Sequence, residues 1–257
     1  MITFEILGRV GLATIDRPER RNALNGELCD ELRAHLGEHR DLRAVVVTGK
    51  GTVFCSGADL GTRFEPVHGG EGETATDTFR PAFERVLDAI VDHPAPVLAA
   101  VNGPAIGAGM QLAVACDLRL AGLGSRFSIP GGRLGIHLSA SNIGRLAALV
   151  GPGAARDFLL AGRQVTAEEA HRLGLVERVA DDARESALDL AGEIATMAPF
   201  TVQGHKRSLN LFAAATALDS GARAEIAELE RRAFASEDLQ EGLKAFAEKR
   251  EPDFQGR

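Results

Sequence analysis

Two glycine-containing loops each follow a buried strand, and together they could hold a carbonyl oxygen. The strand predicted at Val45–Thr48 leads into FCSGADL, and the strand at Val97–Val101 leads into NGPAIGAG and then a helix. Glycine lets a backbone approach a ligand closely, and the first N–H groups of a helix have no partner inside it. Two such donors converging on one point would form an oxyanion hole for a thioester enolate. Ordinary strand-to-helix turns have the same spacing, so spacing alone leaves both interpretations open.

Other readings of these residues are excluded by their spacing. GAGMQL lacks the third glycine of a dinucleotide-binding fingerprint, and no tract matches a phosphate loop with Gly-Lys-Ser/Thr. Ser56 stands in FCSG rather than in the Gly-x-Ser-x-Gly turn of a serine hydrolase. We therefore expect Ser56 to form loop hydrogen bonds rather than to act as a nucleophile.

The elements around the loops alternate between strand and helix. Two β-rich runs flank Gly8-Arg9 and predict a hairpin, and further strands and helices follow in turn, which predicts a mostly parallel α/β core. The expected strands are 2–7, 10–15, 43–49 and 97–101, and the expected helices begin at Asn25 and cover 77–91 and 107–116. After about residue 140 the pattern is largely helical, with a capping box at Thr166–Glu169 and one β-rich run at 174–180. Segment 61–76 has no apolar period and predicts a mobile loop.

Composition and charge exclude several classes of protein. The net charge is -7, and no aromatic residues alternate with Arg or Lys, which argues against a nucleic-acid partner. The tract 94–116 is too interrupted to span a membrane, and the N-terminus has no secretory signal. Three scattered cysteines in apolar runs predict reduced thiols and a cytoplasmic protein. The histidines have no convincing metal-ligand spacing, so we expect no metal: His35, His39, His93, His171 and His205.

A set of short segments in a fixed order resembles the crotonase (enoyl-CoA hydratase/isomerase) superfamily over nearly the whole chain. These segments are RPERRNAL, FCSGADL, AAVNGPAIGAG, ACDLRLA, LVG, GLVERV and EGLKAFAEKREPDF. The resemblance implies an α/β spiral of ββα turns in residues 1–195 and a helical region in residues 196–257 that builds trimers, often paired into hexamers. It also implies a fatty acyl-CoA or enoyl-CoA thioester as ligand or substrate, with no cofactor.

The resemblance also implies roles for particular residues. The thioester carbonyl would accept hydrogen bonds from the backbone N–H groups of Ala58 and Ala108. Coenzyme A would be held by Arg20, Arg21 and Ala23, and by Phe246 and Lys249 reaching from a neighbouring subunit. Lys and Arg can pair with the phosphates of this ligand. Taken alone, Lys249 would be a solvated helix charge.

The chain departs from the family where hydratases carry their acids. Gln111 and Gly131 stand at the positions of the two hydratase glutamates, and Ser139 stands where some isomerases or dehalogenases have Asp. A Gln amide can orient water but cannot exchange a proton near neutral pH. Because positioned acid–base groups are each worth about 10²- to 10⁴-fold, we expect weak or no hydration. Restoring Glu at both positions is expected to create some hydratase activity if the thioester site is intact.

Three hypotheses follow for the function. The first is an acyl-CoA-binding carrier or sensor without hydratase chemistry. The second is an active hydratase, isomerase or other enolate-forming lyase that uses a non-standard acid–base group, with His137 as the best candidate. The third is an oligomeric scaffold without ligand. Weaker acid–base candidates lie in the loop 61–76, and they are Glu65, His68 and Glu71. Ser139, Ser141 and Asn142 could supply hydrogen bonds in place of a carboxylate. Asp59 is interpreted as part of the loop structure.

Overall fold

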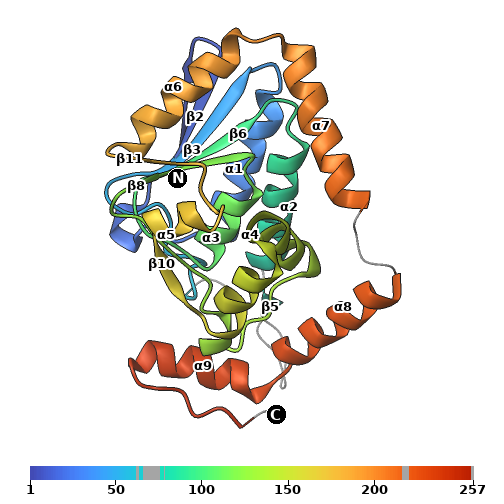
Figure 1. Ribbon diagram of the computed structural model, residues 1–257. Helices are drawn as coiled ribbons and strands as arrows, with labels where there is room; N and C mark the ends of the chain where they lie inside the picture. The colour runs from blue at the N-terminus through green and yellow to red at the C-terminus, as the bar shows by residue number, and fades with distance from the viewer. Residues whose placement is uncertain (62–63, 66–75, 78, 216–219, 256–257) are drawn as a thin grey trace.

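A six-stranded sheet forms the centre of the molecule, in the order β1-β2-β3-β6-β8-β11. The computed structural model describes residues 1–61, 64–65, 76–77, 79–215 and 220–255 (Figure 1). The first two strands form the predicted antiparallel hairpin, and every later strand joins the sheet in parallel. The strands are β1 (Ile2–Leu7), β2 (Val10–Ile15), β3 (Ala44–Gly49), β6 (Val97–Val101), β8 (Leu118–Gly122) and β11 (Arg178–Ala180).

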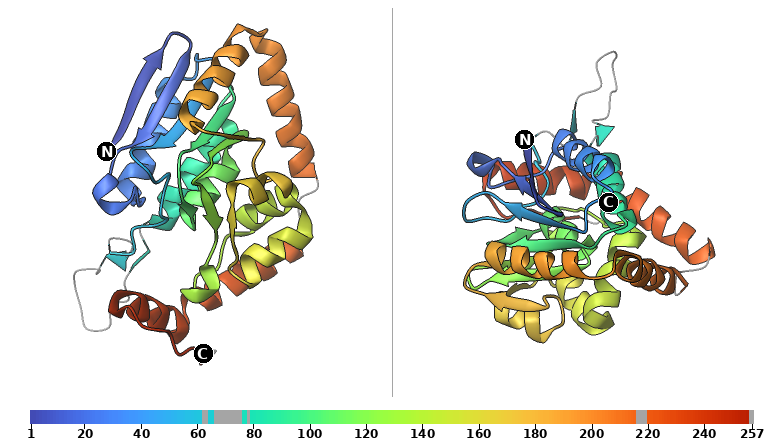
Figure 2. Two further views of the ribbon diagram at one scale, coloured as in Figure 1. Left: turned by 60° about the vertical axis from the view of Figure 1, so that its left-hand side comes forward. Right: turned by 90° about the horizontal axis from the view of Figure 1, so that it is seen from above.

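Both faces of this sheet are covered, which explains its continuous apolar strands. In β3 the side chains of Val45 and Val47 pack toward α1 (Gly26–Glu38) and α2 (Phe79–Asp92), while Val46 packs toward α6 (Ala183–Thr196). Successive residues of a strand point to opposite faces, so one run of valines serves both layers. Figure 2 shows α1 and α6 on opposite sides of the sheet.

A second, three-stranded sheet lies beside the first and carries the glycine loops toward the site. Its order is β10-β9-β7, with β7 (Ala105–Ile106), β9 (Arg126–Ser128) and β10 (Gln164–Thr166). The helix α3 (Ala108–Ala115) starts directly after β7. The predicted cap at Thr166 is confirmed, because its hydroxyl accepts from the N–H of Glu169 at 3.3 Å and begins α5 (Ala167–Arg172). The α/β spiral expected from the sequence is confirmed.

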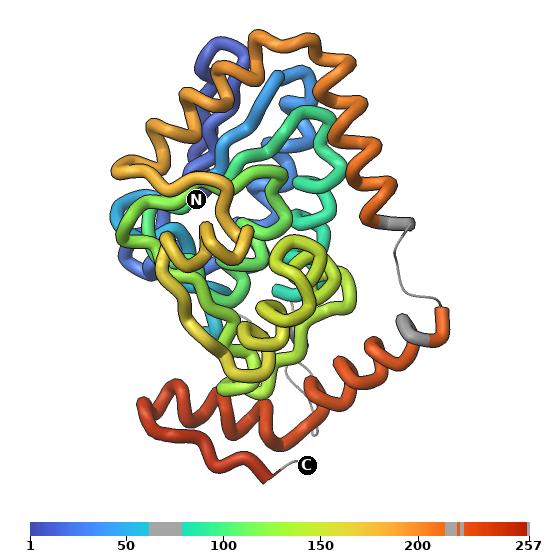
Figure 3. Tube along the Cα trace, viewed as in Figure 1, coloured from blue at the N-terminus to red at the C-terminus, as the bar shows by residue number. Residues whose placement is uncertain are grey.

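The C-terminal part is helical, as predicted. The helix α4 (Ala140–Leu160) is interrupted at Gly151, where φ is 76°, directly before Pro152. After α5 and α6 come α7 (Pro199–Ala215), α8 (Ser220–Phe234) and α9 (Glu237–Glu248). In Figures 1 and 3, α7 runs along the side of the core, and α8 and α9 lie together at the end opposite α6. The predicted domain boundary at 195–196 falls at the end of α6 and stays a prediction.

The predicted loop at 61–76 is described only at its ends. A two-residue strand, β4 (Phe64–Glu65), pairs antiparallel with β5 (Thr76–Asp77). Residues 66–75 lie outside the described residues, and with them His68 and Glu71.

The three cysteines are buried and free, as the sequence predicted. Burial raises the pKa of the Cys55 and Cys116 thiols to about 12, and it raises the pKa of Cys29 as well. These thiols are therefore protonated and unreactive at neutral pH. Among the described helices, none combines the length and the apolar character required to cross a membrane.

The charged residues of the ACDLRLA segment, Asp117 and Arg119, form two buried ionic contacts. Arg119 is 3% exposed, pairs with Glu177 and donates to the carbonyl of Leu175 at 2.8 Å, which holds the segment leading to β11 against β8. Lys206 of α7 donates to Asp117 at 2.8 Å and to two backbone carbonyls, at 3.0 and 3.1 Å. Asp117 and Arg119 therefore attach later parts of the chain to the central sheet.

We predict that Lys206→Met lowers the free energy of unfolding by about 3 kcal/mol, because it leaves Asp117 without its cation and two buried carbonyls without a donor. Arg207→Met, one residue further along α7 and exposed, is the matched control and is expected to change stability by less than about 0.5 kcal/mol. Urea unfolding followed by circular dichroism measures both. Equal midpoints for the two variants would show that Lys206 does not anchor α7.

Candidate functional site

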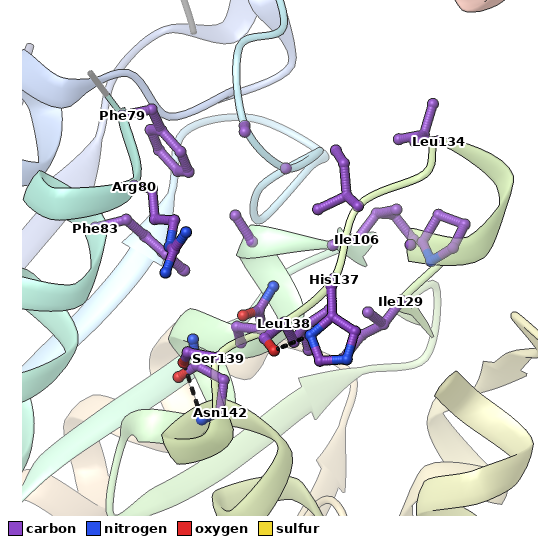
Figure 4. A pocket seen from close by; sticks show the side chains of 18 of the residues that line it. Phe79, Arg80, Phe83, Ile106, Ile129, Leu134, His137, Leu138, Ser139 and Asn142 are labelled. Atoms are coloured by element: carbon purple, nitrogen blue, oxygen red, sulfur yellow. Dashed lines mark hydrogen bonds between the residues drawn. The ribbon is translucent and has the colours of Figure 1, made fainter. Parts of the chain in front are cut away.

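An apolar pocket lies between α2 and the segment 129–139, and both glycine loops reach it. Figure 4 shows Phe79, Arg80 and Phe83 on one side, and Ile106, Ile129 and Leu134 on the other. Polar groups also line the pocket, and they come from five parts of the chain: Arg80, Glu84, Gln111, His137, Ser139, Asn142 and Glu230. A mostly apolar cavity with a few convergent polar groups is the usual form of a small-molecule site.

The first loop presents the N–H of Ala58 to this pocket. Leu24 forms an isolated parallel bridge with Ala58: its N–H donates to Gly57 at 2.8 Å, and its carbonyl accepts from Asp59 at 2.7 Å. Because neighbouring groups along an extended segment point in opposite directions, the Ala58 N–H points away from Leu24. Gly57 has a φ of 115°, which an L side chain rarely adopts, so glycine is required at this turn.

The second loop presents the N–H of Ala108. This residue is the first of α3, so its N–H has no acceptor within the helix and lies at the positive end of the helix dipole. Gly107 precedes it with a φ of 57°. Gly109 packs so closely on the first loop that an added Cβ would lie 2.3 Å from the carbonyl oxygen of Cys55.

The two loops are in direct backbone contact. The N–H of Ile106 donates to Cys55 at 2.9 Å, and the N–H of Cys55 donates to Pro104 at 3.1 Å. A Cβ built on Gly57 would lie 3.8 Å from the backbone nitrogen of Ala108. Both Ala58 and Ala108 line the pocket. The geometry therefore favours an oxyanion hole over two unrelated turns.

Three further positions that the sequence analysis singled out also lie at the pocket. Gln111, Gly131 and Ser139 all line it, so the structure brings them together. At Gly131 a Cβ would lie 2.6 Å from the carbonyl oxygen of Ile136, because the N–H of Ile136 donates back to Gly131 at 3.0 Å in a tight turn. A glutamate at this position would require the turn to shift. The expectation that Glu at both positions creates some hydratase activity stays a prediction, and this contact adds a cost to the change at Gly131.

His137 lies in the pocket wall, where the sequence placed it (Figure 4). Its Nδ1 lies 2.6 Å from the carbonyl oxygen of Leu138. Since a carbonyl can only accept, Nδ1 carries the proton in this contact. In the neutral tautomer that fits this contact, Nε2 is the acceptor.

Glu84 was not identified from the sequence, although it is a carboxylate in the pocket. It lies on α2 with Phe79, Arg80 and Phe83, on the face of the helix that lines the cavity. The Nδ2 of Asn142 donates to its Oε1 at 2.8 Å, and Ser139 hydrogen-bonds it. Desolvation raises the pKa of Glu84, while the hydrogen bond from Ser139 acts in the opposite direction.

The C-terminal helices complete the pocket wall, which the sequence did not reveal. Glu230 of α8 is 6% exposed, lines the pocket and pairs with Arg80 at 2.8 Å. The helix α9 packs on the turn that holds Gly131, since a Cβ on Gly242 would lie 2.7 Å from the carbonyl group of Leu134. A period of apolar residues indicates a helix but not its packing partner, so no sequence signal marked this contact.

The predicted coenzyme A residues lie outside this pocket. Arg20 and Arg21 are exposed, and the segment with Ala23 is attached to the first loop by the N–H of Ser56, which donates to the Arg21 carbonyl at 3.1 Å. An exposed cationic segment therefore lies next to the first loop. Phe246 on α9 and Lys249, which caps the C-terminal end of this helix, are exposed, and neither belongs to the described residues that line the pocket.

Asp59 has the structural role expected from the sequence. It is 9% exposed, pairs with Arg17 at 2.7 Å and accepts from the N–H of Gly61 at 3.1 Å. The predicted loop hydrogen bonds of Ser56 are also present, through its N–H to Arg21 and its hydroxyl to Arg20. Both residues stabilise the loop rather than the cavity.

One histidine cluster differs from expectation. His35, Glu38 and His39 of α1 place three possible metal-ligand atoms within 4.8 Å of one another, although the spacing did not suggest a site. Both imidazole rings also stack with Phe4, at centroid distances of 5.0 and 4.6 Å. The cluster lies on the side of α1 that meets β1, and none of its residues lines the pocket.

We predict that Gly109→Ala disrupts the site, because its methyl group pushes α3 away from Cys55 and displaces the Ala108 N–H. The affinity for an acyl-CoA, measured by calorimetry, is expected to fall at least about tenfold, the loss of roughly one good hydrogen bond. Gly37→Ala in α1, where an added Cβ meets nothing within 4 Å, is the control and should bind normally. Unchanged binding by Gly109→Ala would argue against the two-loop geometry.

Comparison with known proteins shows the family of the chain. The chain matches the enoyl-CoA hydratase/isomerase family model over residues 5–257. It is 40% identical over 248 residues to the probable enoyl-CoA hydratase echA6 of Mycobacterium tuberculosis, covering 94% of both chains. It is 38% identical to the 2,3-dehydroadipyl-CoA hydratase of Escherichia coli, covering 97% of this chain and 96% of that one.

Solved structures show the same relationship. A crystal structure of an enoyl-CoA hydratase/isomerase from Pseudoalteromonas atlantica is 33% identical and superposes with a TM-score of 0.85, covering 99% of both chains. The match thus includes the spiral core and the C-terminal helices together. The chain belongs to the enoyl-CoA hydratase/isomerase family, within the crotonase superfamily.

Proposed function

We propose that the protein binds an acyl-CoA thioester in this pocket and hydrates enoyl-CoA weakly or not at all. One contrast carries the proposal. Both N–H donors for the thioester carbonyl are kept at Ala58 and Ala108, whereas the positions of the two hydratase acids hold Gln111 and Gly131. The site therefore keeps the groups that bind and polarise a thioester and lacks those that add water.

The lining of the pocket suits a hydrocarbon chain. Phe79, Phe83, Ile106, Ile129 and Leu134 surround the space next to the oxyanion hole. Removing an acyl chain from water against such side chains favours binding by about 25 cal/mol per Å² of apolar surface. The related proteins are named for enoyl-CoA and dehydroadipyl-CoA hydration, which supports a CoA thioester as the ligand class.

An assembly of identical subunits belongs to the same proposal. The helix α7 exposes large apolar side chains, with Phe200 at 89% and Phe212 at 75% exposure. Such a surface is unusual on an isolated molecule, and a trimer or hexamer would bury it. Phe246 on α9 and Lys249 at the C-terminal end of this helix would then reach coenzyme A bound to a neighbour, while Arg20, Arg21 and Ala23 contact it from the same subunit.

The cellular role follows from the ligand. We propose a part in fatty acyl-CoA metabolism in the cytoplasm, without a further cofactor. The thioester acidifies its own α-carbon and the oxyanion hole stabilises the enolate, so this chemistry requires an acid–base side chain but no cofactor.

A second candidate function is turnover with His137 as the acid–base group. The observation in its favour is the contact of Nδ1 with the Leu138 carbonyl at 2.6 Å, which fits the neutral tautomer with Nε2 as the acceptor. A single base of this kind would support proton transfer more readily than hydration, which needs both an acid and a base in the family scheme.

We predict that calorimetry detects binding of saturated acyl-CoA, whereas trans-2-enoyl-CoA is hydrated at least about 10⁴-fold more slowly than by a family hydratase with both glutamates. Loss of absorbance of the conjugated thioester measures hydration. Hydration at the rate of that reference enzyme would overturn the proposal, and failure to bind any CoA thioester would leave a scaffold without ligand.

We predict that Gln111→Glu binds acyl-CoA normally, and that adding Gly131→Glu weakens binding at least about tenfold because its Cβ meets the Ile136 carbonyl at 2.6 Å. Adding Gly132→Glu instead is the control, since an added Cβ there meets nothing within 4 Å. The same samples are assayed for hydration. A Gln111→Glu, Gly131→Glu double variant that hydrates faster than Gln111→Glu alone would show that the turn makes room for the acid.

A further inference from the structure

Glu84 is a carboxylate among the polar residues that line a mostly apolar pocket. It shares the pocket with both oxyanion donors, and α2 directs it there together with two phenylalanines. Burying a carboxylate in such surroundings is costly unless it is hydrogen-bonded. The site supplies those bonds from Asn142 and Ser139.

The groups that hold Glu84 are themselves fixed. Asn142 is 4% exposed, and Arg145 donates to its Oδ1 at 2.8 Å, which orients the Nδ2 toward Glu84. The hydroxyl of Ser139 accepts from the N–H of Asn142 at 3.3 Å and is left with its proton to donate to the carboxylate. The chain Arg145–Asn142–Glu84 therefore holds the carboxylate in one place.

Glu84 also differs from the other pocket carboxylate. Glu230 faces the guanidinium of Arg80 at 2.8 Å and forms an ion pair. Glu84 instead hydrogen-bonds the neutral side chains of Asn142 and Ser139. A carboxyl group without a directly bonded cation can gain and lose a proton more readily, which is the property that acid–base catalysis needs.

We propose that Glu84 is the catalytic acid–base residue of a double-bond isomerisation, in which a β,γ-unsaturated acyl-CoA becomes the α,β-unsaturated isomer. Glu84 takes a proton from the α-carbon, and the electron pair of the broken C–H bond forms a dienolate. The oxygen of this dienolate accepts hydrogen bonds from Ala58 and Ala108. The protonated Glu84 then returns its proton to the γ-carbon, and the double bond becomes conjugated with the thioester.

One carboxyl group is sufficient for this reaction, because the proton taken is the proton returned. No water, oxidant or second acid enters, and the chemistry is therefore compatible with Gln111 and Gly131. Ser139 supports the same conclusion, since a hydrogen bond from its side chain lowers the pKa of the carboxylate that α2 brings in. The inference rests on the proposed binding of a CoA thioester.

The pH dependence provides a second signature. Desolvation raises the pKa of Glu84, and the charged groups that also act on it are Arg145, Asp88 and Glu230. A base must be deprotonated to take the α-proton, so the rate should fall as the pH drops through this raised pKa. The acidic limb of the profile should lie above the range of an ordinary glutamate and should be absent from Glu84→Gln.

The test separates binding from turnover in wild type, Glu84→Gln and His137→Gln. Calorimetry with a saturated acyl-CoA measures binding, and the rise in conjugated-thioester absorbance from a β,γ-enoyl-CoA measures isomerisation. Glu84→Gln is expected to bind within about twofold of wild type and to lower kcat by about 10²- to 10⁴-fold. Asp92→Asn, an exposed carboxylate at the end of the same helix, is the control and should retain the wild-type rate.

Several results would overturn the inference. Isomerisation by Glu84→Gln at the wild-type rate excludes Glu84, and loss in His137→Gln alone assigns the reaction to the histidine. Binding by the wild type without isomerisation, and without exchange of the α-protons in D₂O, leaves the proposed binding function intact and removes the catalytic role. Absence of binding removes both.

Discussion

The backbone contact between the loops 54–60 and 103–109 is the constraint on which the site depends. An oxyanion hole needs two N–H donors at a fixed separation, and side chains between the loops would hold them apart. Gly57, Gly107 and Gly109 remove those side chains, and the Cys55 backbone joins the loops through hydrogen bonds to Pro104 and Ile106. The valine-rich strands behind the loops keep their ends in register, because both faces of the sheet are buried.

Because of this backbone contact, the polar side chains of the pocket can differ while the two N–H donors keep their positions. The donors belong to the backbone, so they survive substitution at Gln111 or Gly131. The turn at Gly131 is closed on Ile136 and would have to shift to admit a side chain. A carboxylate enters instead from α2, where Asn142 and Ser139 hold it. The proposed binding and the proposed proton transfer thus depend on separate parts of one fold.

Much of the fold and half of the site could be predicted from the sequence. The hairpin, the buried strands and the helix after Gly107 follow local patterns, and the positions of Ala58, Ala108 and Gln111 follow from family motifs. Glu84 could not be predicted, because it occupies a polar position in an amphipathic helix and such positions are usually solvated. In the sequence, Glu84 is marked only by its position after Phe83. Tertiary packing decides which face of α2 lines the pocket, so this position did not reveal a role. The roles of Lys206 and Glu230 depend on contacts distant in sequence.

We propose that the thioester carbonyl lies between the N–H groups of Ala58 and Ala108. Infrared difference spectroscopy of an acyl-CoA with a ¹³C-labelled thioester carbonyl measures this directly, because two hydrogen bonds polarise the C=O bond. The carbonyl stretch of the bound ligand is expected to shift to lower frequency than in water, and Gly109→Ala is expected to reduce the shift. A bound acyl-CoA whose carbonyl absorbs at its solution frequency would show that the carbonyl does not lie between these two donors.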